Sequence, residues 1–124
     1  MALSNSPDKE ALARELGAHE FIDGSKVDQA EALQKLGGSK VIICTAPSGK
    51  IIETLLGGLA VDGVIVILAV ADKIEVPILP MIMKRLRIQV SSPLLHNHLL
   101  INHHRVGHLE LHKIQRIVSN LVKL

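Results

Sequence analysis

Two short apolar runs joined by a helical stretch, at residues 41–44 and 64–70, constrain the fold of this chain most strongly. Both runs are rich in β-branched residues and lack polar alternation, which is typical of strands buried on both faces of a parallel sheet. Together with the helical stretch, they predict one right-handed βαβ unit. Ligands on such sheets bind at the carboxyl ends of the strands, which here are Thr45, Ala46 and Pro47, and Leu68, Ala69 and Val70.

Strand and helix signals alternate through residue 92. We expect strands at 2–4, 19–22, 40–45, 64–71 and 87–91, helices at 6–16, 27–36, 49–59 and 80–85, and a short extended piece at 75–77. Ser6 followed by Pro7 is typical of a helix start, and Gly17 is well placed to end that helix. The alternation predicts an α/β fold of the doubly wound type.

Composition excludes several classes of protein. A chain of 124 residues that is 48% hydrophobic is large and apolar enough to fold as one domain. Phe21 is its only aromatic residue, which argues against stacking platforms for nucleic acid, and the single Cys44 excludes a disulfide framework. No apolar run reaches 18 residues, so we expect no membrane span and a cytoplasmic protein that does not bind nucleic acid.

Five segments in order resemble the cofactor-binding half of the zinc-dependent medium-chain alcohol dehydrogenases, most closely their cinnamyl-alcohol-type, NADP-using branch. They are Ser4-Asn5-Ser6 with Lys9, LARELGAHEFIDGS (12–25), VIICTAPSG (41–49), LLGGLAVDGVIVILAV (55–70) and IMKRLRIQVSSP (82–93). The resemblance covers about three quarters of the chain. It implies oxidoreduction of an alcohol or aldehyde with NADP(H), with zinc polarising the substrate oxygen.

The resemblance also implies roles for individual residues. Around the adenosine ribose it places Ser4, Asn5, Ser6 and Lys9, and since positions 4–6 hold no acid, their hydroxyls and the Lys9 amine would suit a 2′-phosphate. The family often has Arg where this chain has Asn5. The cofactor would also be bordered by Thr45, Ala46 and Pro47, while the nicotinamide would meet Leu68, Ala69 and Val70, with Ser91 and Ser92 nearby.

Two parts of the family pattern do not occur in this sequence. The phosphate-binding turn GxGxxG is absent, and so are the Cys and His zinc ligands, so we expect no catalytic and no metal-binding residue here. In the usual strand order 3-2-1-4-5-6, the strand that would precede residue 1 is the central one. We therefore expect an incomplete Rossmann-type sheet with exposed edges. Strand 19–22 could pair directly with strand 40–45, or a partner chain, including a second copy, could fill the gap.

The C-terminal segment differs from the rest of the chain. Residues 1–83 carry 7 Lys/Arg and 11 Asp/Glu, whereas residues 84–124 carry 7 Lys/Arg, one acid and six of the seven histidines. We therefore separate a partial Rossmann domain, residues 1–93, from a basic, His-rich and mostly helical segment, residues 94–124. Apolar residues at 106, 109, 114, 117, 118, 121 and 122 form a helical stripe that would cover one sheet face.

Other interpretations of this segment stay open. His104, His108 and His112 are spaced four residues apart on one helical face, so they could bind Zn²⁺ or Ni²⁺ or form a solvated polar face. The basic helix could also dock on an acidic partner or a membrane surface. The sequence thus predicts a fragment of an NADP(H)-dependent alcohol or aldehyde oxidoreductase that is inactive alone. The alternative is a non-catalytic binding or dimerisation module that uses sheet edges and the basic helix.

Overall fold

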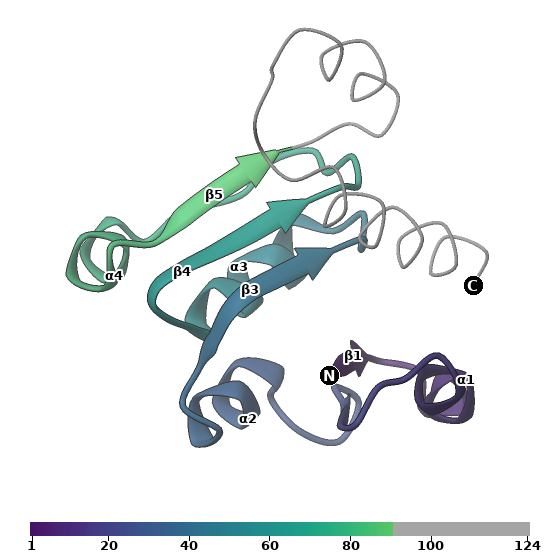
Figure 1. Ribbon diagram of the computed structural model, residues 1–124. Helices are drawn as coiled ribbons and strands as arrows, with labels where there is room; N and C mark the ends of the chain where they lie inside the picture. The colour runs from purple at the N-terminus through teal and green to yellow at the C-terminus, as the bar shows by residue number, and fades with distance from the viewer. Residues whose placement is uncertain (91–124) are drawn as a thin grey trace, which may run out of the picture.

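A computed structural model describes residues 1–90, and residues 91–124 lie outside the described part. Its strands are β1 (Ala2–Ser4), β2 (Phe21–Asp23), β3 (Ser39–Cys44), β4 (Leu59–Ile67) and β5 (Arg87–Val90). Its helices are the 3-10 turn η1 (Pro7–Lys9), α1 (Glu10–Glu15), α2 (Gln29–Lys35), α3 (Gly49–Gly57) and α4 (Ile78–Lys84) (Figure 1). The predicted α/β alternation is confirmed. The predicted C-terminal helix, Ser91 and Ser92 are among the residues that are not described.

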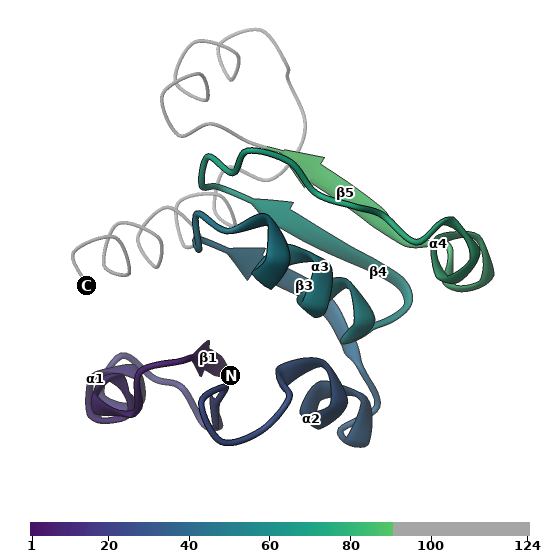
Figure 2. The same cartoon turned by 180° about the vertical axis from the view of Figure 1, so that it is seen from behind.

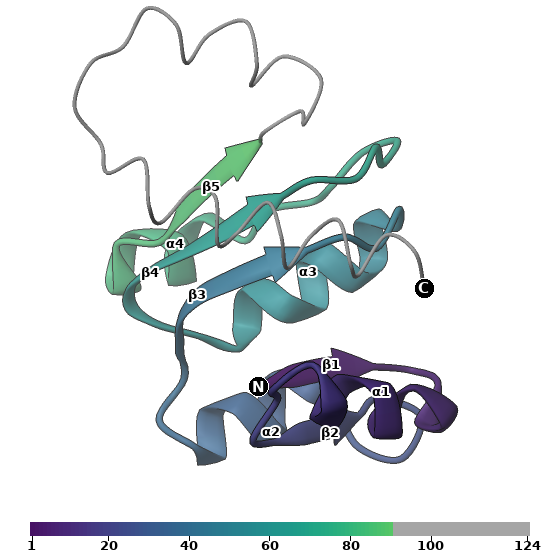
Figure 3. The same cartoon turned by 45° about the vertical axis from the view of Figure 1, so that its right-hand side comes forward.

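The strands form two parallel sheets. β1 pairs with β2, and the larger sheet has the order β3-β4-β5, with every pair parallel. Figure 3 shows β1 and β2 lying apart from the larger sheet. Within residues 1–90 no ladder joins the sheets, so β2 does not pair with β3, and β1 and β3 each have one edge without a strand partner. This arrangement confirms the prediction of an incomplete Rossmann-type sheet without its central strand.

The first helix differs in detail from its prediction. Ser6 precedes it in an extended conformation, as expected for an N-cap, but its side chain makes no capping hydrogen bond. Instead, the Ser6 N–H donates to Ser4 Oγ at 3.1 Å, and the first turn is the 3-10 turn η1. Gly17 ends α1 with a φ of 100°, which an L side chain rarely adopts.

The first part of β4 is irregular, and from the sequence we expected a turn there, with the strand beginning only at residue 64. β4 begins at Leu59 rather than 64, and its register against β3 shifts between Ser39 and Val41. Within the irregular part, Asp62 has a φ of 62°, and Arg85, with a φ of 50°, donates two hydrogen bonds of 2.7 Å to its carboxylate. These bonds lower the pKa of the Asp62 carboxyl and raise that of the Arg85 guanidinium. They fix the turn against the end of α4.

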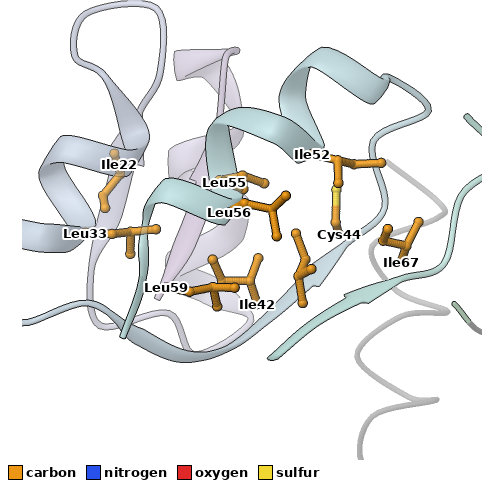
Figure 4. Close-up of a cluster of buried hydrophobic side chains, with 10 residues drawn as sticks. Ile22, Leu33, Ile42, Cys44, Ile52, Leu55, Leu56, Leu59 and Ile67 are labelled. Atoms are coloured by element: carbon orange, nitrogen blue, oxygen red, sulfur yellow. The ribbon is translucent and has the colours of Figure 1, made fainter. Parts of the chain in front are cut away.

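The hydrophobic core lies between α3 and the larger sheet (Figures 2 and 4). Ile52 of α3 and Leu59 and Ile65 of β4 are fully buried. Leu33 of α2 and Ile22 of β2 belong to the same cluster, because α2 contacts both β2 and α3. The two sheets are therefore held together through helix packing rather than through strand pairing. Among residues 1–90, no helix is long and apolar enough to cross a membrane.

Candidate functional site

A cavity of about 260 Å³ lies beside the carboxyl ends of β1 and β2 and the first turns of α3. The walls of the cavity are therefore formed by loops and helices that follow strands of both sheets. The residues that line it are Asn5, Gly24, Val27, Asp28, Gln29, Ser48, Lys50, Ile51 and Thr54. Most of them carry donors or acceptors at the surface of the chain, and only Val27 and Ile51 supply larger apolar surface. Such a lining suits a polar ligand with an apolar part, such as a nucleoside.

The wall nearest β1 is held by a contact between two amides. Gln29 Nε2 donates to Asn5 Oδ1 at 3.2 Å, which leaves the Asn5 amide nitrogen as the donor end of that side chain. Gly24 makes this approach possible, because a Cβ at that position would overlap both amide groups. The Gly24 N–H also donates to Ser4 O at 2.8 Å, which ties the ends of β1 and β2 together. The Asn5 amide therefore provides a hydrogen-bond donor at the end of β1. In NAD-binding sheets an acidic residue at this position accepts hydrogen bonds from the ribose hydroxyls.

The cavity has one cation and one carboxylate. Lys50 stands in the first turn of α3 and is exposed. The carboxylate belongs to Asp28, whose Oδ1 already accepts a hydrogen bond of 2.8 Å from the Glu31 N–H at the start of α2. Lys50 is therefore the group in this lining that is best suited to hold an anion such as a phosphate.

The loops that follow β3 and β4 lie next to each other, at the carboxyl ends of these two strands. The Leu68 N–H donates to Cys44 O at 3.0 Å, which places the segments 45–47 and 68–70 after adjacent strand ends. Thr45, Pro47 and Val70 are exposed there, and Val70 is 91% exposed. These strand ends are thus at the same edge of the larger sheet, as predicted, but they do not line the cavity.

The loop after β4 continues onto α3. The Glu75 N–H donates to Glu53 Oε1 at 2.6 Å, and Gly49 lies so close to the Lys73 carbonyl that a Cβ there would overlap its oxygen. These contacts fix the start of α3, which carries Ser48 and Lys50 at the cavity. The position of the Lys50 backbone thus depends on the close approach at Gly49.

The described residues do not fit a zinc site. Among residues 1–90 no group of three or more His, Cys, Asp or Glu side chains could hold a metal ion. Cys44 is 3% exposed inside β3, and this burial raises the pKa of its thiol, although a backbone hydrogen bond with Ala46 opposes the shift. A buried thiol with a raised pKa is a poor metal ligand and a poor nucleophile.

Comparison with known proteins places the chain in a family. A model of the zinc-binding dehydrogenase domain matches residues 1–97. The chain belongs to the zinc-binding dehydrogenases. An alcohol dehydrogenase, patD, from Aspergillus clavatus is 38% identical to this dehydrogenase chain over 122 residues, which cover 98% of this chain and 26% of that protein. The chain therefore spans about a quarter of the length of this curated relative.

Several solved structures resemble this dehydrogenase chain at above 25% identity, and two of them were solved with a nicotinamide cofactor. A putative zinc-binding dehydrogenase from Sinorhizobium meliloti, bound to NADP, is 26% identical with a TM-score of 0.67, over 77% of this chain and 31% of that one. The quinone oxidoreductase from Thermus thermophilus, whose complex with NADPH was solved, is 29% identical with a TM-score of 0.63, over 80% of this chain and 32% of that one. The folds are thus similar over most of the described residues.

Only one of the predicted site residues of this dehydrogenase chain lines the cavity. Asn5 lines it, whereas Ser4, Ser6 and Lys9 belong to β1 or to the segment that follows it and are absent from the lining. Sequence reasoning missed Gly24, Gln29 and Lys50. Gly24 and Lys50 come shortly after the predicted strands 19–22 and 40–45, so the rule that ligands bind at strand ends could have pointed to them. The Gln29 contact joins residues that are 24 positions apart and left no local signal.

Proposed function

We propose that this chain supplies part of the cofactor site of an oxidoreductase that transfers hydride between NADP(H) and an alcohol or aldehyde. Membership of the zinc-binding dehydrogenases and the similarity to an alcohol dehydrogenase support the reaction class. The two structural neighbours that were solved with NADP or NADPH support the choice of cofactor. When bound, the nicotinamide ring of NADP(H) accepts or donates the hydride.

The observation that carries the proposal is the cavity at the ends of β1 and β2. It has a cation, Lys50, and the donor end of Asn5, and no acid occupies positions 4–6. In this proposal Lys50 holds the 2′-phosphate of the adenosine ribose, and Asn5 donates to a ribose or phosphate oxygen. Val27 and Ile51 contribute the apolar surface against which an adenine ring would lie. Ser4, Ser6 and Lys9 surround the same ribose from the β1 side.

The remaining cofactor contacts in the proposal come from the larger sheet. The segments 45–47 and 68–70 follow adjacent strand ends, so together they would form one wall beside the nicotinamide. Ser91 and Ser92 belong to the same proposal but lie outside the described residues. We further propose that the 124-residue chain alone does not catalyse hydride transfer, because its sequence lacks the GxGxxG turn on which a pyrophosphate rests.

A comparison of two nucleotides tests the cofactor assignment. We expect adenosine 2′,5′-bisphosphate to bind the full chain about twofold to fivefold more tightly than 5′-AMP, because an exposed lysine contributes about 0.5–1 kcal/mol to an ion pair. Lys50→Gln should remove this preference when affinities are measured by NMR titration. Lys35→Gln is the matched control, since Lys35 is an exposed helical lysine that is absent from the cavity lining.

Other results of the same titration would contradict the proposal. Equal affinity for the two nucleotides would rule out recognition of the 2′-phosphate. A preference that Lys9→Gln abolishes and Lys50→Gln leaves intact would assign that role to the segment after β1 instead. NADPH binding with micromolar affinity, or NADPH oxidation by an aldehyde, would refute the inactivity of the isolated chain.

The split sheet favours a second candidate function, a non-catalytic dimerisation module. β1 and β3 each have an edge that pairs with no strand among residues 1–90, and Val41 of β3 is 55% exposed. Such edges are templates for pairing with another chain. If two copies pair through β3, sedimentation velocity should show a dimer whose fraction rises with concentration, and Val41→Lys should reduce it. A monomer at all concentrations would exclude this function.

A further inference from the structure

The larger sheet has two apolar faces, and α3 accounts for one of them. Side chains alternate between the faces of a strand, so Ile42, Cys44, Ile65 and Ile67 face α3 and are buried. The opposite face, called here the open face, carries Val41, Ile43, Val64 and Val66. Their register pairs Val41 with Val64 and Ile43 with Val66, so the four side chains form one apolar group.

None of the helices among residues 1–90 covers the open face. α3 lies on the other side of the sheet, as the front and rear views show (Figures 1 and 2). Val41 is 55% exposed, and the other three side chains are only partly buried. On β5, Arg87 and Gln89 lie beside Val64 and Val66, so the apolar group has a polar border on that side. Strands this apolar are typical of sheets that are covered on both faces.

We propose that the chain's own residues 106–122 form an amphipathic helix that covers the open face. The sequence gives this segment an apolar stripe, at 106, 109, 114, 117, 118, 121 and 122. A helix of this length would extend about 25 Å, close to the roughly 30 Å of a nine-residue strand such as β4. The opposite side of the helix carries His108, His112 and Arg116, which suits a surface toward solvent.

The connection from the sheet to this segment is long enough. The chain leaves the sheet at Val90, the end of β5, and residues 91–105 follow before the stripe begins. Fifteen residues span at most about 50 Å, which exceeds the width of a three-stranded sheet several times. A second copy would have to lose translational freedom to cover the same face, whereas the attached segment is already at high effective concentration.

Thiol accessibility in the full chain tests the proposal. Val64→Cys places a thiol on the central strand of the open face, and the native Cys44, which is 3% exposed, reports unfolding of the core in the same molecule. We expect the introduced thiol to react slowly with a maleimide. Adding Ile117→Asp to the stripe should accelerate that reaction at least about tenfold, because burying the carboxylate against four apolar side chains is strongly unfavourable. Cys44 should stay unreactive.

The control is His112→Asp, which places the same charge on the other side of the helix and should leave the rate unchanged. A fast reaction without Ile117→Asp, or equal rates with both substitutions, would overturn the proposal. If Ile117→Asp also makes Cys44 reactive, the substitution has unfolded the core. In that case, cross-linking of unsubstituted chains tests the proposal instead. Links from Lys113 or Lys123 to Lys40 within single chains of a mixed ¹⁴N/¹⁵N sample support the proposal. Links found only between chains assign the open face to a second copy.

Discussion

Ile65→Ala is expected to lower the free energy of unfolding by about 2–5 kcal/mol, the largest effect of a single substitution that we expect in this chain. Ile65 is 0% exposed at the centre of β4, with strands on both sides and α3 above it. The shorter side chain removes apolar contacts and leaves a cavity, because neighbouring strands hold the backbone in place. Urea denaturation followed by circular dichroism measures the change.

The matched control for this substitution is Val70→Ala. Val70 follows the same strand but is 91% exposed, so its truncation should change the free energy of unfolding by less than about 0.5 kcal/mol. Folded domains are commonly stable by about 5–15 kcal/mol, so loss of the Ile65 side chain removes a large share of that stability. Equal effects of the two substitutions would show that β4 is not the centre of the core.

Gly49→Ala should destabilise the chain by about 1–3 kcal/mol, although alanine is the better helix former. A Cβ at Gly49 would overlap the carbonyl oxygen of Lys73, and a backbone atom cannot move aside as a side chain can. Either α3 or the loop after β4 must shift. Because Ser48 and Lys50 flank Gly49, the shift should also weaken binding of adenosine 2′,5′-bisphosphate. Denaturation and NMR titration measure the two effects.

Gly57→Ala in the same helix is the control for Gly49→Ala. Its Cβ would meet the Ala30 Cβ at 3.4 Å, an ordinary contact, and alanine lowers the backbone entropy of the unfolded chain. We expect this variant to be as stable as the original chain or slightly more stable, with unchanged nucleotide binding. If the two variants behave alike, the close approach of Gly49 to Lys73 does not constrain the cavity.

Most of the fold was predictable because its signals are local. Continuous β-branched runs indicated β3 and β4, and residues such as Gly17 marked the helix ends. The early start of β4 was not predictable, because Val61-Asp62-Gly63 has the composition of a turn. Arg85, 23 residues away, fixes this segment through its two hydrogen bonds to Asp62, and no local pattern encodes such a contact.

The candidate site was predictable only in part. The carboxyl ends of parallel strands follow from the order of elements, and this rule led to the segments 45–47 and 68–70. Asn5, in contrast, came from the family resemblance. The rule did not lead to Gln29, which reaches Asn5 from α2, because the contact depends on how two crossovers pack. Lys9 came from the family resemblance, whereas Lys50, which lines the cavity, was missed. Which lysine lines a cavity depends on helix positions that the sequence pattern does not give.

The separation of β1 and β2 from the larger sheet divides the backbone hydrogen bonds into two independent ladders. The smaller ladder has three residue pairs, and of its side chains only Ile22 is buried. Amides in residues 2–23 should therefore exchange with solvent through local openings that leave β3, β4 and β5 intact. Because the cavity takes its walls from both parts, a bound nucleotide would join them into one cooperative unit and slow that exchange.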